Sequence, residues 1–311
     1  MAINKFMRAA LKALSYPDLN VKSNYKMERV FNNLAHPSIK VLYKMWDHKI
    51  SADGHEIDVR VFFPEKSRSD EIILFFHGGG WVIGNIDSYT KICANLAKQT
   101  GRKVLSVDYR LAPEYPFPYA VEDCYRVARE VFLNNGSLYF KGKDVILFGD
   151  SAGGNLAAAL SLMARDRGEF RVRRQILIYP LTHNNHREDS PFPSVVENGK
   201  DYLLTSKRIC DYMDLYIQDD RYLTSPYVAP LLSEDLSQQP DTLIVTAEYD
   251  PLRDEGEAYG EKLRRFGNRV EICRVKDALH GFFSLPMRFA HVKYCYKVIN
   301  AFLDEVNEVE E

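Results

Sequence analysis

Short apolar runs that alternate with helix-length stretches are the feature that most restricts the fold of this chain. Six runs rich in Val, Ile, Leu and Phe lie at Ile72–Phe76, Val104–Val107, Val145–Phe148, Ile176–Tyr179, Thr242–Thr246 and Val270–Val275. Helix-compatible stretches centre near residues 88–99, 119–133, 154–166, 255–266 and 287–306. Strands that are apolar throughout are buried on both faces, so the pattern predicts an α/β fold with a mostly parallel sheet and helices on both sides.

Two more strands are predicted ahead of these runs. Residues 41–50 and 57–63 have strand-like composition and are joined by the turn Ala52-Asp53-Gly54. Together with the six apolar runs they give a central sheet of about eight strands.

Two segments depart from this alternation. Residues 1–35 read as helical, with an apolar face that recurs every three or four residues at Ile3, Phe6, Met7, Ala10, Leu11 and Leu14. The stretch between Pro180 and Pro240 is far longer than a crossover connection needs and contains a polar loop followed by a helical stretch at 206–217. We therefore predict one domain over 1–311, in which the N-terminal helix packs over the protein's own core and the stretch between Pro180 and Pro240 is an insertion at the edge of the sheet where ligands bind.

Composition excludes several classes of protein. With 41 basic and 43 acidic residues the net charge is −2, so the chain lacks the excess of positive charge that is typical of nucleic-acid-binding proteins. No apolar stretch approaches the roughly 18 residues of a membrane span. Five scattered cysteines favour a reducing compartment, so a cytoplasmic location is expected. We expect no cofactor and no metal, since nucleotide-binding motifs are missing and His183 and His186, on a polar loop without a third ligand, read as surface residues.

A serine is predicted at the tip of a strand–turn–helix. Gly149-Asp150-Ser151-Ala152-Gly153 follows the apolar run Val145–Phe148 and opens a helical stretch. A Gly-x-Ser-x-Gly turn of this kind holds its serine in a strained conformation and lifts the hydroxyl clear of the sheet. The flanking glycines are expected where strand and helix approach too closely for a Cβ. Ser151 is thus the candidate nucleophile.

A serine nucleophile needs a base and an orienting acid, and both are expected after later strands. Asp250 stands at the end of the strand near 242–247, and His280, followed by Gly281, lies in the loop after the last strand. Asp254 is the alternative acid, although its place in a first helical turn is favoured by the helix dipole alone. His291, the other histidine after Asp250, falls inside an amphipathic helix, so His280 is the predicted base.

The predicted oxyanion hole lies at His77-Gly78-Gly79-Gly80-Trp81, directly after the run Ile72–Phe76. Three glycines leave the backbone free to aim N–H groups at a developing oxyanion, with the N–H of Ala152 completing the hole. Gly78, Gly79 and Gly80 are all candidates, and which two donate stays open. His77 is expected to hold the loop, and Trp81 and Phe282 are expected to contact the substrate.

These motifs resemble the hormone-sensitive-lipase-like branch of the α/β-hydrolases. The matching stretches are HGGGW at 77–81 with Gly84, DYRLAPE at 108–114, GDSAGG at 149–154, EYDPLRDEG at 248–256 and HGF at 280–282. The resemblance implies the same roles for Ser151, Asp250, His280, the three glycines and Ala152. It also implies that elements from 1–35 and 183–235 form a cap over the acyl pocket. The resemblance further implies a serine carboxylesterase that prefers short acyl chains, acetyl among them.

Two other functions stay open. Amidases of the arylformamidase type have a similar fold and carry a similar His-Gly-Gly loop. This alternative stays open because one triad can cleave both ester and amide bonds. A non-catalytic small-molecule receptor also shares the fold, but the plant receptors of this kind lack the histidine that His280 supplies here. A small-molecule ester is the expected partner, and a homodimer is a further prediction.

Overall fold

The computed structural model describes residues 20–35, 43–52, 54–133 and 145–305 of the 311-residue chain. The strands are β1 (Met45–Ala52), β2 (His55–Phe62), β3 (Ile72–Phe76), β4 (Lys103–Val107), β5 (Val145–Asp150), β6 (Arg174–Ile178), β7 (Asp241–Tyr249) and β8 (Val270–Leu279). The helices are α2 (Val21–Ala35), α3 (Thr90–Thr100), α4 (Tyr119–Leu133), α5 (Ala152–Arg167), α6 (Pro193–Glu197), α7 (Ser206–Tyr216), α8 (Arg253–Arg265) and α9 (Ala290–Asp304).

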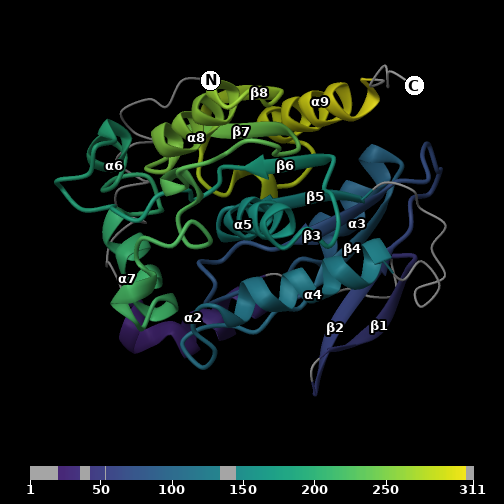
Figure 1. Ribbon diagram of the computed structural model, residues 1–311, viewed down its shortest axis with the longest axis horizontal. Helices are drawn as coiled ribbons and strands as arrows, with labels where there is room; N and C mark the ends of the chain where they lie inside the picture. The colour runs from purple at the N-terminus through teal and green to yellow at the C-terminus, as the bar shows by residue number, and fades with distance from the viewer. Residues whose placement is uncertain (1–19, 36–42, 53, 134–144, 306–311) are drawn as a thin grey trace.

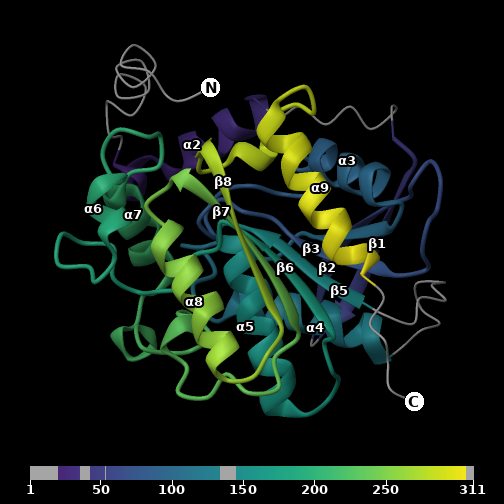
Figure 2. The same ribbon diagram turned by 90° about the horizontal axis from the view of Figure 1, so that it is seen from above.

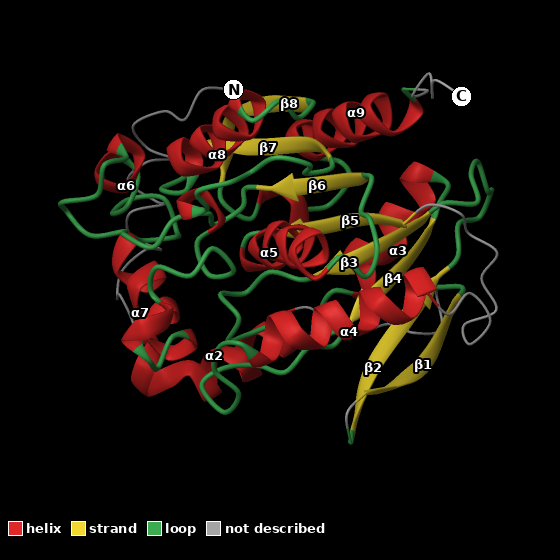
Figure 3. Ribbon diagram, viewed as in Figure 1, coloured by secondary structure: helices red, strands yellow, loops and turns green. Residues whose placement is uncertain are grey.

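All eight strands form one twisted sheet (Figure 3). Their order is β1-β2-β4-β3-β5-β6-β7-β8, in which β1–β2 and β2–β4 are antiparallel and every other pair is parallel. Strands β3 and β5 are buried along their whole length, as expected for a sheet that is covered on both faces. The predicted fold class is confirmed.

Helices cover the two faces of the sheet in separate layers (Figure 1). Helices α3 and α9 pack on one face, where Leu96 and Ile299 join the core beneath them. Helices α4, α5 and α8 pack on the other face. Helix α5 runs through the centre, and each of its residues from Ala152 to Ala164 is buried, which explains why the sequence shows no polar stripe there.

The remaining helices lie beyond the carboxyl ends of the parallel strands. Seen from above, α2, α6 and α7 gather at one end of the sheet (Figure 2). The predicted N-terminal helix is present over 21–35, whereas its expected apolar face from Ile3 to Leu14 lies outside the described residues.

The last strand is longer than the sequence indicated. The pairing of β7 with β8 continues past an irregularity between Ala247 and Tyr249, so that Tyr249 still pairs with Leu279. Because of this extension, His280 follows the end of β8 directly and lies level with the residues that end β7.

Candidate active site

Ser151 stands at the sharp turn between β5 and α5. Its backbone has φ 55° and ψ −121°, a strained conformation for a residue with a side chain. A Cβ on Gly149 would lie 2.1 Å from the carbonyl oxygen of Gly153, and one on Gly153 would lie 2.0 Å from that of Phe76. The strand and helix therefore meet at glycines because no other residue fits between them.

Three side chains from separate loops form a hydrogen-bonded relay. His280 Nε2 lies 2.9 Å from Ser151 Oγ, and His280 Nδ1 lies 2.7 Å from Asp250 Oδ2. Asp250 is fully buried, and its other oxygen accepts the N–H of Leu252 at 2.9 Å. Because the carboxylate only accepts, the imidazole donates through Nδ1 and leaves Nε2 to accept the serine proton.

The alternative acid does not reach this relay. Asp254 lies in the first turn of α8, where its Oδ2 accepts the N–H of Ser194 at 2.8 Å and its Oδ1 lies 2.8 Å from Arg253 Nε. Its contacts hold α6 against α8. The structure thus joins His280 to Asp250 and gives Asp254 a different set of partners.

The glycine loop after β3 lies beside Ser151 with one of its amides already engaged. The N–H of Gly78 donates to Asp150 Oδ1 at 2.9 Å and to the Tyr89 hydroxyl at 3.1 Å. The N–H groups of Gly79 and Gly80 have no acceptor within the described ranges, and both residues line the cavity at Ser151. The geometry therefore favours Gly79, Gly80 and Ala152 over Gly78 as donors to an oxyanion.

A cavity of about 200 Å³ opens at Ser151 and His280. Its walls include Leu181, Leu204, Ile209, Tyr212 and Leu252. Trp81 also lines the cavity and is fully buried, with its indole stacked on Tyr216 at 4.3 Å between ring centroids. Phe282 is buried beside Tyr179 and does not line the cavity, where Gly281 and Ser284 are found instead.

Asp150 is a buried carboxylate that sequence reasoning missed. Only 3 % of it is exposed, and burial raises its pKa to about 6. Besides the N–H of Gly78, it accepts hydrogen bonds from the hydroxyls of Tyr89 at 3.2 Å and Tyr179 at 3.5 Å. The sequence signal for this residue is the acid at the second position of the Gly-x-Ser-x-Gly turn, next to the serine.

His77 lies beneath the glycine loop. Its Nδ1 lies 2.8 Å from the carbonyl oxygen of Gly78, and its ring stacks on Tyr109 at 4.2 Å between centroids. Burial lowers the pKa of His77 to about 4, so the ring is neutral at physiological pH. A neutral ring held in this way fits the expected role of supporting the loop.

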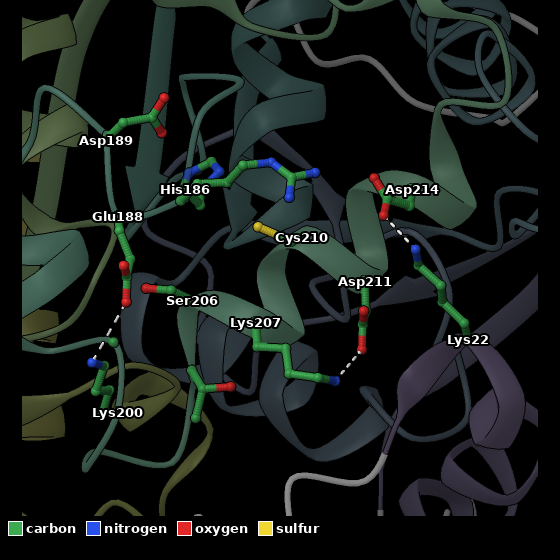
Figure 4. Close-up of a pocket in the computed structure, with 13 residues that line it drawn as sticks. Lys22, His186, Glu188, Asp189, Lys200, Ser206, Lys207, Cys210, Asp211 and Asp214 are labelled. Atoms are coloured by element: carbon green, nitrogen blue, oxygen red, sulfur yellow. Dashed lines mark hydrogen bonds and ion pairs between the residues drawn. The ribbon is translucent and has the colours of Figure 1, made fainter.

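A larger cavity of about 790 Å³ lies on the outer side of α7 (Figure 4). None of Ser151, Asp250 or His280 lines it, and six of the charged side chains around it form three ion pairs. Lys207 lies 2.9 Å from Asp211, Lys200 lies 3.9 Å from Glu188, and Lys22 contacts Asp214. We find no catalytic arrangement in this cavity.

His186, at the edge of this second cavity, corrects one expectation. It is 1 % exposed, and its Nε2 lies 2.6 Å from Glu255 Oε2. Glu255 is also fully buried and accepts the N–H groups of Thr182 and His183. The prediction of a surface residue was wrong because a carboxylate on α8 draws the loop inward. His183 is only half-buried.

Neither a metal site nor a membrane helix is found within the described ranges. No group of three or more His, Cys, Asp or Glu side chains there is placed to hold a metal ion. Likewise, none of the described helices has the length and apolar character needed to cross a membrane.

Comparison with known proteins gives consistent matches. A family model described as "alpha/beta hydrolase fold" matches residues 73–284. The chain is 39% identical over 241 residues to an arylesterase of Saccharolobus solfataricus, covering 77% of each protein. It is 33% identical over 237 residues to an ethyl acetate hydrolase of Pseudomonas putida, covering 75% of this chain and 73% of that one. The solved hyperthermophilic esterase of Pyrobaculum calidifontis aligns over 97% of each chain with a TM-score of 0.83 and 35% identity.

Proposed function

The chain belongs to the alpha/beta hydrolase family and is a carboxylic ester hydrolase, and from this premise we propose that it cleaves short-chain acyl esters through a serine nucleophile. The family and the esterase activity predicted from the sequence are thereby confirmed. The relay of Ser151, His280 and Asp250 at the cavity is the observation that carries the proposed mechanism.

In the proposed reaction, Ser151 Oγ attacks the ester carbonyl carbon while His280 Nε2 takes the hydroxyl proton. The carbonyl oxygen becomes an oxyanion, which the N–H groups of Gly79, Gly80 and Ala152 stabilise. Collapse of the tetrahedral intermediate breaks the ester bond, and His280 returns its proton to the leaving alcohol. Water then attacks the acyl-enzyme by the same steps, with Asp250 stabilising the imidazolium throughout.

Short acyl chains are favoured by the size of the cavity. Its volume of about 200 Å³ is below the roughly 300–1,000 Å³ of common ligand pockets. The similarity to an ethyl acetate hydrolase supports the same substrate class. The named relatives are esterases, so nothing favours the amidase alternative, and an enzyme leaves no place for the non-catalytic receptor.

We further propose that the chain is a single domain with a cap over the cavity. Leu204, Ile209 and Tyr212, from the segment predicted as cap over 183–235, contribute to the cavity walls. Helix α2 contacts α7 of that segment. The contribution expected from residues before 20 lies outside the described part of the chain.

Substitution of the nucleophile tests the mechanism. Ser151→Ala should lower kcat on p-nitrophenyl acetate by roughly 10⁵- to 10⁶-fold, because only the oxyanion donors and substrate binding would remain. An alkyl phosphonate should add to the wild type and not to Ser151→Ala, as followed by intact mass. Ser67→Ala, at an exposed serine, is the matched control and should behave as the wild type. Turnover by Ser151→Ala within tenfold of the wild type would assign the nucleophile elsewhere.

A further inference from the structure

Among the described residues, helix α2 makes many polar contacts and buries little apolar surface, although the partly buried Tyr25 also packs against the core. Val21 is the one residue of this helix that is buried. Met27, Val30, Phe31 and Leu34 recur at helical spacing, yet each is between 53% and 71% exposed. Since apolar burial fixes most surface helices, the position of α2 must depend on its hydrogen bonds and ion pairs.

Two consecutive residues of α2, Glu28 and Arg29, contact different parts of the molecule. Arg29 donates to the carbonyl oxygens of Val82 at 2.7 Å and Ala112 at 2.8 Å, beside the glycine loop. Glu28 points toward α7, which lies alongside α2 (Figure 1). There its carboxylate accepts from Arg208 Nη2 at 2.9 Å and from the hydroxyl of Tyr212 at 2.8 Å.

Tyr212 links this contact to the catalytic cavity. Its ring forms part of the cavity wall and lies so close to the glycine loop that a Cβ on Gly80 would be 2.5 Å from Tyr212 Cγ. The residue is 7 % exposed. Burial raises the pKa of its hydroxyl, which therefore keeps its proton and needs an acceptor, and Glu28 supplies one.

The cost of removing that acceptor gives Glu28 its influence on the wall. A buried donor left without a partner destabilises the structure, and the side chain avoids this cost by turning its hydroxyl toward water. Rotation would take the Tyr212 ring away from Gly80 and lengthen the cavity. A Tyr212 hydroxyl that keeps its acceptor on α2 has no such reason to move, so the Glu28 carboxylate keeps the ring in the wall.

We propose that Glu28 is a specificity-determining residue, which limits acyl-chain length by giving the Tyr212 hydroxyl its acceptor and so keeping the ring in the cavity wall. This inference rests on the proposed serine esterase function. It concerns the fit of the substrate chain and leaves the relay at Ser151 untouched.

The test is a double-mutant cycle read as the ratio of kcat/KM for p-nitrophenyl hexanoate to that for the acetate. Glu28→Ala should raise this ratio on the order of tenfold, because one or two methylenes gain a place in the cavity. The change should come through KM for the hexanoate, with kcat on the acetate kept. The same ratio for Tyr212→Phe should stay within about threefold of the wild-type ratio, since the phenylalanine ring has no hydroxyl that needs an acceptor.

The double variant gives the decisive comparison. In the Tyr212→Phe background, Glu28→Ala should no longer raise the ratio, since the two side chains act through one hydrogen bond. Asp214→Asn is the matched control, because it removes another contact between α2 and α7 away from the catalytic cavity. That variant should keep the wild-type ratio.

Each result has a distinct meaning. An unchanged ratio in Glu28→Ala, or an equal rise in both Tyr212 backgrounds, would overturn the inference, since the second pattern means that α2 acts without Tyr212. A wild type that hydrolyses none of the esters would refute the proposed function and the inference with it. Normal wild-type turnover with no shift refutes the inference alone.

Discussion

Asp250 and Asp254 are only four residues apart, but they face different partners. Asp250 Oδ2 holds His280 Nδ1 at 2.7 Å, whereas Asp254 holds Ser194 and Arg253. Asp250→Asn should therefore keep the fold and lower kcat by roughly 10⁴-fold, because an amide can stabilise the wrong imidazole tautomer. Steady-state kinetics with a thermal midpoint for each variant measures both effects.

Asp254→Asn is the control for this prediction. Its amide oxygen can still accept the N–H of Ser194, while the ion pair with Arg253 is lost, so the expected cost is a few tenths to about 1 kcal/mol of stability. Turnover should be unaffected. A variant at 254 that loses activity as severely as the one at 250 would transfer the role of acid.

At this scale the sequence predicted the three residues that the structure brings together, but it missed part of their surroundings. Ser151, Asp250 and His280 could be placed because chain order and strand ends fix where each must stand. Asp150 could not, because its partner Gly78 is 72 residues earlier and meets it only once two loops have folded together. Phe282 was predicted to contact the substrate. Its side chain instead lies in the core beside Tyr179.

At the scale of elements, the contact between β3 and α5 depends on a missing side chain. Gly153→Ala would place a Cβ 2.0 Å from the carbonyl oxygen of Phe76. The nearest atoms, from Phe76 and His77, all belong to the backbone and cannot turn away. The helix must then shift, so we expect the free energy of unfolding to fall by at least about 2–3 kcal/mol. Chemical denaturation of the purified protein measures this change.

Gly256→Ala is the matched control because Gly256 also lies in the first turns of a helix. A Cβ there would have ordinary contacts, the nearest being Thr246 Cγ2 at 3.4 Å. Alanine is about 1 kcal/mol better than glycine in a helix, so this variant should be as stable as the wild type or more so. Equal destabilisation by both substitutions would mean that the close approach at Gly153 is not what matters.

Element types could be predicted better than element ends. The runs and helical stretches from Ile72 onward all became the expected strands and helices, because their periodicity reflects burial on the sheet. The end of β8 could not be predicted, since its last pairing depends on an irregularity in β7. His186 was misjudged for a similar reason, because its partner Glu255 comes from a helix that the sequence does not place beside it.

For the whole molecule, two buried groups give opposite responses to acid. The pKa of His77 is about 4, against 6.5 when unfolded, so the unfolded state gains a proton first and stability falls as the pH drops from 6.5 to 4. The pKa of Asp150 is about 6, against 3.8 when unfolded, so the folded state gains a proton first and stability rises as the pH drops from 6 to 3.8. Between pH 6 and 4 the two effects oppose each other.

Asp150→Asn should expose the unopposed effect of His77. The amide oxygen of this variant would present the same acceptor to Gly78 without a charge to bury, so at pH 7.5 the variant should be more stable by about 2–3 kcal/mol. This advantage should vanish near pH 4, giving the variant a steeper loss of stability in acid. Burial holds the pKa of the neighbouring Tyr89 and Tyr179 hydroxyls well above their usual range, so both stay neutral over this range. Denaturation midpoints at pH 7.5, 5.5 and 4 check the prediction, and a constant difference would contradict it.

The fold of the whole chain could be predicted because alternation of strand and helix leaves few arrangements open. Its single-domain organisation, its homodimer and its cytoplasmic location remain predictions. They depend on contacts of the complete chain with itself, with a second copy or with its surroundings, which the pattern of one sequence does not encode.

The weak apolar packing of α2 also bears on how easily this helix moves relative to the sheet. A helix that is fixed mostly by hydrogen bonds and ion pairs can leave its place by exchanging those partners for water, at the cost of only a small apolar contact at Val21. Such a displacement is a local opening, which is far more frequent than unfolding of the sheet. Added salt weakens the ionic part of this attachment and leaves the β-sheet intact. The ionic strength of the medium thus acts on the attachment of α2 more than on the β-sheet that carries Ser151, Asp250 and His280.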